Sequence, residues 1–271
     1  MPKTAHRLGI SWKNEVLTVT GPDLPVPHID IHYIEAFCRP GSHERLWSKT
    51  VIPHRTTLLS QHNAGARLEL QSTLEDGVVV THTITAAEDE LDFRLSVHNP
   101  IPHESEAHWA QPCIGVGAFT GSANSADPDD YLRKCFVFLS GMATTMPTPE
   151  WATSALLTPG QVWCPASVPR TDVNPRPLNR LTPSNGLIGC FSGDGEMILA
   201  TAWEPYQELF QGVLQCIHSD FRIGGLRPQE RKNIRGKVYF VGNDIDALLE
   251  RYRKDFPEHH DTDEQPLSPR L

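Results

Sequence analysis

Two histidines in distant parts of the chain have the chemistry needed for proton transfer. His108 begins a predicted strand that follows the strand at residues 91–97 and a turn containing Pro100 and Pro102. An imidazole has an unperturbed pKa of about 6.5, so it can give or take a proton near neutral pH. We therefore expect His108 to be a catalytic acid or base; the alternative is a core histidine satisfied by a neighbouring group.

The stretch 206–219 places Glu208, Gln211 and His218 among apolar residues. Buried polar groups need partners or a cavity, and the end of a strand is a suitable place from which to project a side chain into a cleft. His218 ends a predicted strand, so we expect it to be the second catalytic group, with Glu208 as a further candidate. The alternative for Glu208 is an ion pair with an arginine. The arginines considered are Arg176, Arg180 and Arg222.

Five other residues have side chains suited to a hydroxylated ligand. Aromatic rings offer an apolar face, amides hydrogen-bond hydroxyl groups, and a guanidinium holds a carboxylate. The expected substrate-binding residues are Trp109, Gln111, Arg176, Tyr206 and Gln211.

Local motifs of several other enzyme classes are absent: the sequence has no P-loop, no GxGxxG after a strand, no HExxH and no GxSxG. A second hypothesis is a metal site, because imidazole and carboxylate suit divalent transition metals. Its ligands would be Glu208 with His62, His82, His108 or His218. No short ligand spacing supports this site, so we expect no metal and no cofactor.

Composition narrows the class of protein. The chain has 271 residues, 39% hydrophobic and 21% charged, which is enough apolar material for a sizeable core. A net charge of −9 offers no basic patch for nucleic acid. No apolar run reaches the roughly 20 residues of a membrane span, and residues 1–10 lack the apolar stretch of a signal peptide. We expect a cytoplasmic protein with no nucleic-acid or membrane partner.

The elements that must position these residues are mostly strands. Side chains alternate between apolar and polar at period two in many segments, and short turns at residues 75–77, 87–90 and 193–195 favour antiparallel pairing. The predicted strands are residues 7–10, 15–19, 29–36, 55–59, 66–70, 78–85, 91–97, 133–139, 186–191, 197–204, 213–219 and 232–241. The six cysteines, scattered and without a CxxC pair, are predicted to be buried free thiols.

One helix is predicted near the end of the chain. Asp244 can cap it, apolar residues recur at helical spacing up to Phe256, and Pro257 ends it. The remaining residues are polar and include prolines. We predict a single all-β sandwich domain over residues 1–257 and a disordered tail over residues 258–271.

The order of three short motifs resembles the galactose mutarotase-like, or aldose 1-epimerase-like, superfamily, with this chain as a divergent member. The motifs are Val97-His98-Asn99-Pro100 leading to Ala107-His108-Trp109, then Cys216-Ile217-His218-Ser219, then Leu226-Arg227-Pro228-Gln229-Glu230. The resemblance covers residues 66–241 and implies an antiparallel β-supersandwich. It also implies that His108 is the acid that protonates a ring oxygen, and that His218 stands where the family has its glutamate base.

We therefore expect a carbohydrate-active enzyme of the epimerase, isomerase or lyase type, acting on a sugar or sugar acid. In this hypothesis His218 is the base, His108 the acid, and Arg176 steadies an anionic group of the substrate. Two alternatives stay open: a non-catalytic carbohydrate-binding module, and a metal-dependent enzyme on the same fold. The sequence leaves the oligomeric state undefined.

Overall fold

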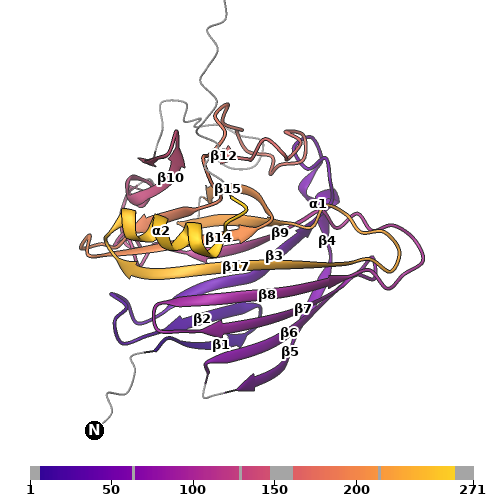
Figure 1. Cartoon of the computed structure of the whole chain (residues 1–271), viewed down its shortest axis with the longest axis horizontal. Helices are drawn as coiled ribbons and strands as arrows, with labels where there is room; N and C mark the ends of the chain where they lie inside the picture. The colour runs from indigo at the N-terminus through magenta and orange to yellow at the C-terminus, as the bar shows by residue number, and fades with distance from the viewer. Residues whose placement is uncertain (1–6, 63–64, 128–129, 147–160, 213–214, 260–271) are drawn as a thin grey trace, which may run out of the picture.

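Two antiparallel β-sheets pack face to face in the computed structural model, which describes residues 7–62, 65–127, 130–146, 161–212 and 215–259 (Figure 1). The strands of the eight-stranded sheet are, in spatial order, β1 (Gly9–Lys13), β2 (Val16–Thr20), β3 (Ile29–Cys38), β9 (Trp109–Gly115), β16 (Cys216–Arg222), β15 (Tyr206–Gly212) and β12 (Val162–Trp163), with β4 (Val51–Ile52) paired to β3. The strands of the nine-stranded sheet are β11 (Met142–Thr145), β10 (Cys135–Leu139), β13 (Ile188–Phe191), β14 (Met197–Glu204), β17 (Arg231–Gly242), β8 (Glu90–His98), β7 (Val79–Ala86), β6 (Arg67–Leu74) and β5 (His54–His62). The predicted all-β antiparallel sandwich is confirmed.

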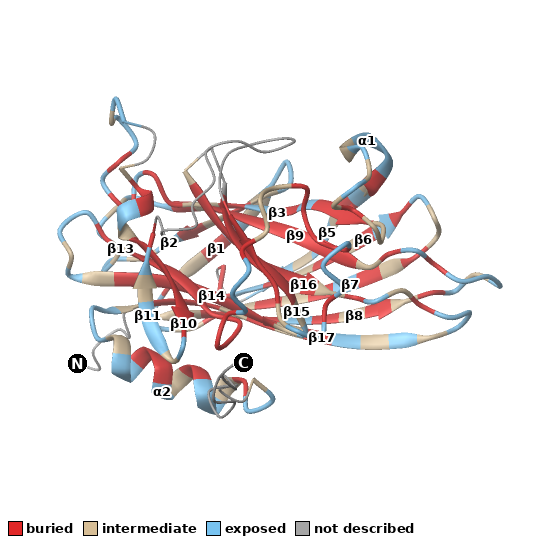
Figure 2. Cartoon of the chain, turned by 90° about the horizontal axis from the view of Figure 1, so that it is seen from above, coloured by how far each residue is buried: buried red, intermediate tan, exposed pale blue. Residues whose placement is uncertain are grey.

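The main core lies between the two sheets, as the buried residues in Figure 2 show. In β8 the predicted alternation holds, because Leu91, Phe93, Leu95 and Val97 are buried while the residues between them are more exposed. All six cysteines are buried and free, as predicted.

The outer face of the eight-stranded sheet is also buried. In β16, Ile217 packs in the core between the sheets, so its neighbours Cys216 and His218 point to the other side. There the segment from Val162 to Val173 packs against Phe210 of β15 and covers the strands. Polar residues on this face are therefore inside the protein, although they are outside the main core.

Helix α2 (Ile245–Asp255) lies against the outer face of the nine-stranded sheet. Asp244 caps it as predicted, since its side chain accepts a hydrogen bond from the Ala247 backbone N–H. The other helical segments are α1 (Trp47–Thr50) and the 3-10 turn Leu132–Lys134. In the described part of the chain, none of the helices combines the length and apolar character required to cross a membrane.

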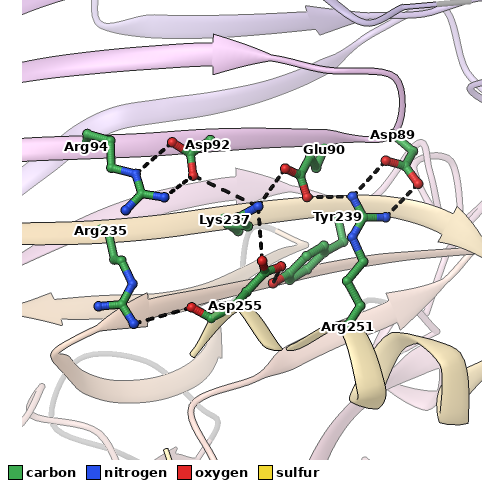
Figure 3. Close-up of polar contacts among 9 residues, drawn as sticks. All are labelled: Asp89, Glu90, Asp92, Arg94, Arg235, Lys237, Tyr239, Arg251 and Asp255. Atoms are coloured by element: carbon green, nitrogen blue, oxygen red, sulfur yellow. Dashed lines mark hydrogen bonds and ion pairs between the residues drawn. The ribbon is translucent and has the colours of Figure 1, made fainter. Parts of the chain in front are cut away.

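An ionic network ties α2 to β8 and β17 (Figure 3). Lys237 Nζ lies 2.6 Å from Glu90 Oε1 and 3.4 Å from Asp255 Oδ1. Arg251 reaches Glu90 at 2.5 Å and Asp89 at 2.6 Å. Each acid therefore shares a cation with a neighbour, and the last turn of α2 is fixed to two strands of the sheet.

The predicted elements differ from the observed ones in several places. The strand predicted at residues 213–219 is β16, at Cys216–Arg222, and no separate strand was predicted where β15 lies. Glu258 and His259, assigned to the predicted disordered tail, contact the sandwich instead: Arg235 binds Glu258, and His259 Nε2 lies 2.5 Å from Glu204. Residues 260–271 lie outside the described part of the chain.

Candidate functional site

A polar hollow of about 450 Å³ opens beside the start of β9. Its walls come from the turn before β9 and from the connection between β16 and β17, and they include His108, Glu104, Glu230 and Lys232. The volume lies within the range of small-molecule sites. An imidazole, two carboxylates and an ammonium thus face one space large enough for a small polar ligand.

Backbone contacts fix His108 at the wall of this hollow. Its carbonyl accepts hydrogen bonds from the backbone N–H groups of Ile223, at 2.7 Å, and Gly224, at 2.8 Å. Gly225 has a φ of +73°, and a Cβ added there would lie 3.0 Å from His108 Nε2. Glycine at position 225 therefore allows both this turn and the placement of the imidazole.

Asp172 stands behind the His108 ring. Its Oδ2 lies 3.5 Å from His108 Nδ1 and accepts a hydrogen bond from Arg222 Nη1 at 3.1 Å, while its Oδ1 accepts one from the Gly41 backbone N–H at 3.0 Å. The carboxylate is nearly buried, whereas 24% of the His108 side chain is exposed. The carboxylate lies near Nδ1 at ion-pair distance without a hydrogen bond to it, and Nε2 is left for a ligand, as in a general acid or base.

The charged groups across the hollow are also held in place. Lys232 Nζ donates hydrogen bonds to the backbone carbonyls of Ile223, at 2.9 Å, and Gly225, at 2.6 Å. Glu230 accepts a hydrogen bond from the Arg227 backbone N–H at 2.7 Å, and its other oxygen lies 3.9 Å from Lys232 Nζ. A fixed ammonium beside a carboxylate suits a ligand with hydroxyl or carboxylate groups.

A second polar cluster lies on the outer face of the eight-stranded sheet, and we call it the outer-face cluster. Its members are Cys113 of β9, Glu208 of β15, and Cys216, His218 and Asp220 of β16, all of them buried. Cys216 Sγ lies 3.3 Å from His218 Nε2, and His218 Nδ1 lies 3.5 Å from Asp220 Oδ1. Alternate positions of one strand thus form a thiol–imidazole–carboxylate row.

The charges of this cluster support one another. A hydrogen bond from the Cys113 thiol, together with the neighbouring imidazole, outweighs burial and lowers the pKa of Cys216 to about 4. Burial alone would lower the pKa of His218, but the Cys216 and Asp220 charges raise it to about 10. Burial and the charge of Asp220 raise the pKa of Glu208. These pKa shifts favour a thiolate at Cys216 and an imidazolium at His218. The nearby carboxyl group of Glu208 favours its protonated form.

Several polar atoms of the outer-face cluster lack hydrogen-bond partners. They are His218 Nδ1, Glu208 Oε1 and both carboxylate oxygens of Asp220. Glu208 Oε2, in contrast, accepts a hydrogen bond from the Asn174 backbone N–H at 2.9 Å. Buried polar atoms without partners are rare in folded proteins, so this group calls for a functional explanation.

The structure does not bring the predicted catalytic residues together. His108 precedes Trp109, which pairs with Arg222, and His218 lies four residues before Arg222 on β16. The same register puts His108 level with residue 223, five residues from His218, so at about 3.3 Å per residue the two histidines are about 16 Å apart along the strand. His218 and Glu208 belong to the sealed outer-face cluster, whereas His108 faces the hollow. A histidine pair acting across one sugar ring is therefore not supported.

The five predicted substrate-binding residues also lie in different parts of the protein. Gln111 donates to Glu35 at 3.1 Å, and the Arg176 guanidinium lies 4.5 Å from the centre of the Phe210 ring, so both lie near the outer-face cluster. Trp109 is fully buried and packs against Trp47. Tyr206 packs against the main core, and Gln211 is buried on the face of β15 opposite Phe210. None of these five lines the hollow that contains His108.

The metal site that was weighed from histidines and Glu208 is not assembled among the described residues. His82 is buried between the sheets, where it bonds Tyr33 and Ser72, and His62 lies exposed on β5. Three partners of the two predicted histidines were not predicted as site residues: Asp172, Cys216 and Asp220. Asp172 comes from a loop that no spacing links to His108, whereas Cys216, His218 and Asp220 recur at every second residue, a strand pattern that the sequence displays.

Comparisons with known proteins show which solved structures have a similar fold. No family model matches the sequence, and no curated protein is similar enough in sequence to count as a match. Among solved structures the chain is similar to an alpha-mannosidase from Enterococcus faecalis V583, with 9% identity and a TM-score of 0.51 over 94% of this chain and 31% of that chain. It thus matches less than a third of the mannosidase's length.

Galactose mutarotase-like proteins are also among the similar structures. One from Lactobacillus casei ATCC 334 has 9% identity and a TM-score of 0.46, covering 86% of this chain and 99% of that chain. Another, from Clostridium acetobutylicum, has 11% identity and a TM-score of 0.44, covering 88% and 96%. The fold of this chain is thus similar to that of galactose mutarotase-like proteins, in line with the resemblance predicted from the sequence, and a similarity of fold does not identify a reaction.

Proposed function

We propose that the chain is a carbohydrate-active enzyme of the epimerase, isomerase or lyase type that binds a sugar or sugar acid in the hollow beside His108. The observation that carries the proposal is the His108–Asp172 contact at the wall of that hollow, with 3.5 Å between Nδ1 and Oδ2. In this proposal His108 is the acid of the reaction, as the family resemblance implies, and His218 is not its partner.

The proposed reaction needs two proton-transfer groups and no oxidant. His108 Nε2 gives a proton to the ring oxygen or leaving group, and Glu230, a carboxylate in the same hollow, takes the proton that the substrate loses. Asp172 is a positioning residue, because it contacts the imidazole and not the substrate. Lys232, fixed by two backbone carbonyls, is suited to a carboxylate or hydroxyl group, the role first predicted for Arg176.

A panel of neutral and uronic sugars, followed by NMR in deuterated water, tests the proposal. We expect anomer interconversion, deuterium exchange or elimination for at least one sugar. His108→Gln should lower its rate by about 10²–10⁴-fold. His103→Gln, which changes an exposed histidine outside the hollow, is the matched control and should leave the rate unchanged.

Asp172→Asn gives a separate readout of positioning. It should lower kcat more than it raises KM and shift the pH profile, because the amide holds the ring without its negative charge. A wild-type protein inert toward every sugar, or a His108→Gln variant as fast as wild type, would overturn the enzymatic proposal. Sugar binding without turnover, lost in His108→Gln, would instead support the carbohydrate-binding module.

A further inference from the structure

Three soft or borderline ligand atoms meet in the outer-face cluster. The thiols of Cys113 and Cys216 and an imidazole nitrogen of His218 all lie within 4.8 Å of one another. The pairing of β9 with β16, Ile114 opposite Ile217, puts Cys113 across from His218 and on the same face. Two strands that are neighbours in the sheet thus deliver the three groups to one point.

We propose that Cys113, Cys216 and His218 form a zinc-binding site, separate from the hollow that contains His108. Tetrahedral zinc is held at about 2.3 Å by thiolate sulfur and about 2.0–2.1 Å by imidazole nitrogen, which spaces neighbouring ligand atoms about 3.5–3.8 Å apart. The 3.3 Å between Cys216 Sγ and His218 Nε2 is close to that spacing. No two of the three ligand atoms are more than 4.8 Å apart, so side-chain shifts of about 1 Å or less bring them to the spacing that zinc requires.

Charge balance favours a divalent cation at this buried place. Zinc binding releases the protons of the Cys113 thiol and of His218 Nε2 to solvent; two thiolates and a neutral imidazole then bring a net charge of −2 to Zn²⁺, so the metal and its three ligands together are neutral. A buried charge is costly unless it is paired or coordinated, and a neutral metal–thiolate unit avoids that cost. The donor set also decides the class of metal, because thiolate with imidazole suits zinc, whereas magnesium and calcium require oxygen ligands.

Asp220 is placed to accept a hydrogen bond from the ring nitrogen of His218 that does not bind zinc, as a carboxylate ordinarily does for a zinc-bound histidine. Its Oδ1 lies 3.5 Å from His218 Nδ1, the ring nitrogen that faces away from the two thiols. Both Asp220 oxygens and this nitrogen lack other hydrogen-bond partners. Ligation through Nε2 would leave Nδ1 protonated, and this N–H would donate a hydrogen bond to Asp220, forming a carboxylate–histidine–zinc unit.

Phe210 and the burial of the cluster hold the ligands ready. The Phe210 ring stacks on the His218 ring with 4.0 Å between centres and a 12° angle, which fixes the plane of the imidazole. Cys113 and Cys216 are 7% and 5% exposed, so bulk water and large thiol reagents are largely excluded. Three protein ligands leave one coordination position for water or a small exogenous ligand.

Zinc titration of the reduced, untagged full-length protein tests the site. After removal of bound metal with a chelator, Zn²⁺ is added in competition with a chromophoric chelator. We expect one equivalent to bind and the midpoint of thermal unfolding to rise with zinc. Cobalt(II) in place of zinc should give a thiolate-to-cobalt charge-transfer band and the visible spectrum of a tetrahedral site.

Variants assign the ligands and their support. Cys113→Ser and Cys216→Ser each remove one thiolate ligand, so each variant should lose that thiolate's part of the cobalt charge-transfer band. Each should also lower zinc affinity by more than 100-fold. Asp220→Asn, which keeps every ligand, should lower it by about 10–100-fold. Cys190→Ser, at a buried cysteine of the other sheet, is the matched control and should bind like wild type.

Either of two results would overturn the zinc site. One is less than a tenth of an equivalent of zinc or cobalt on the wild-type protein, which needs no variant and so is independent of folding defects. The other is binding that persists unchanged in both cysteine variants while circular dichroism shows them folded.

Discussion

Three histidines in this protein have different partners, and the partners decide what each imidazole can do. His82 lies between hydroxyl groups, 2.9 Å from Tyr33 Oη and 3.0 Å from Ser72 Oγ, and is structural. His108 has a carboxylate behind it and a hollow in front. His218 lies between a thiol and a buried carboxylate. Residue type alone would make all three histidines equal candidates for proton transfer.

Acid sensitivity should arise at His82. Burial lowers its pKa to about 3, whereas the unfolded chain protonates this histidine near pH 6.5. Below pH 6.5 the unfolded state therefore binds a proton that the folded state refuses, and stability falls by about 1.4 kcal/mol per pH unit until the folded pKa is reached. Urea unfolding at pH 7, 5.5 and 4.5 measures this slope.

His82→Gln should remove that contribution and flatten the acid limb of the stability curve. At pH 7 the variant should be less stable by about 1–3 kcal/mol, because one hydroxyl loses its partner. His62→Gln, at an exposed histidine of β5, is the comparison and should keep the wild-type slope. An acid limb in His82→Gln as steep as that of wild type would contradict the assignment.

At the scale of elements, the sheets act as frames whose outer faces are put to different uses. The outer face of the nine-stranded sheet is covered by α2, with apolar contacts through Leu248 and Tyr252 and the ionic network around Lys237. The outer face of the eight-stranded sheet is covered by the segment that contains Asp172 and Asn174. That segment reaches the hollow through Asp172 and the outer-face cluster through Asn174.

The cap of α2 gives an element-scale prediction. Asp244 Oδ1 accepts a hydrogen bond from the Ala247 backbone N–H at 2.9 Å, and its charge lies at the positive end of the helix. Asp244→Ala should lower the free energy of unfolding by about 0.5–2 kcal/mol, and Asp244→Ser should recover most of the loss. Denaturant unfolding of the three proteins decides; an Asp244→Ser variant no better than Asp244→Ala would exclude capping as the cause.

At the scale of the whole molecule, aromatic rings join the two sheets. Tyr33 of β3 contacts Phe93 of β8 at 5.3 Å, Phe93 contacts Trp203 of β14 at 5.1 Å, and Trp203 contacts Phe221 of β16 at 4.8 Å between ring centres. The series crosses the core from the first sheet to the second and back. Offset and tilted contacts of this kind add to the stabilisation from burial.

Gly236 makes room for this arrangement. It pairs with Trp203 across β14 and β17, and a Cβ at Gly236 would lie 2.3 Å from Trp203 Cε3. Gly236→Ala should therefore displace the indole and destabilise the protein by about 1–3 kcal/mol or more. Gly242→Ala, on the same strand with nothing within 4 Å, should leave stability unchanged or slightly raised. Equal unfolding midpoints for the two variants would refute this account.

The local pattern of residues accounts for much of the architecture. Period-two alternation locates most strands of both sheets, the turn at Gly193-Asp194-Gly195 joins β13 to β14 as predicted, and Asp244 marks the start of α2. These features depend on residues that are close in the chain and on the alternation of side chains along a strand. Both can therefore be read directly from the sequence.

Which residues meet in each site is decided by contacts between segments that are distant in the sequence. Alternation indicates which face a side chain takes, but the register of pairing decides how far along the sheet it lies, so His108 and His218 share a sheet and fail to meet. Asp172 reaches His108 from a loop, and Cys113 meets Cys216 from another strand, because long-range pairing and burial outweigh any local preference at these residues.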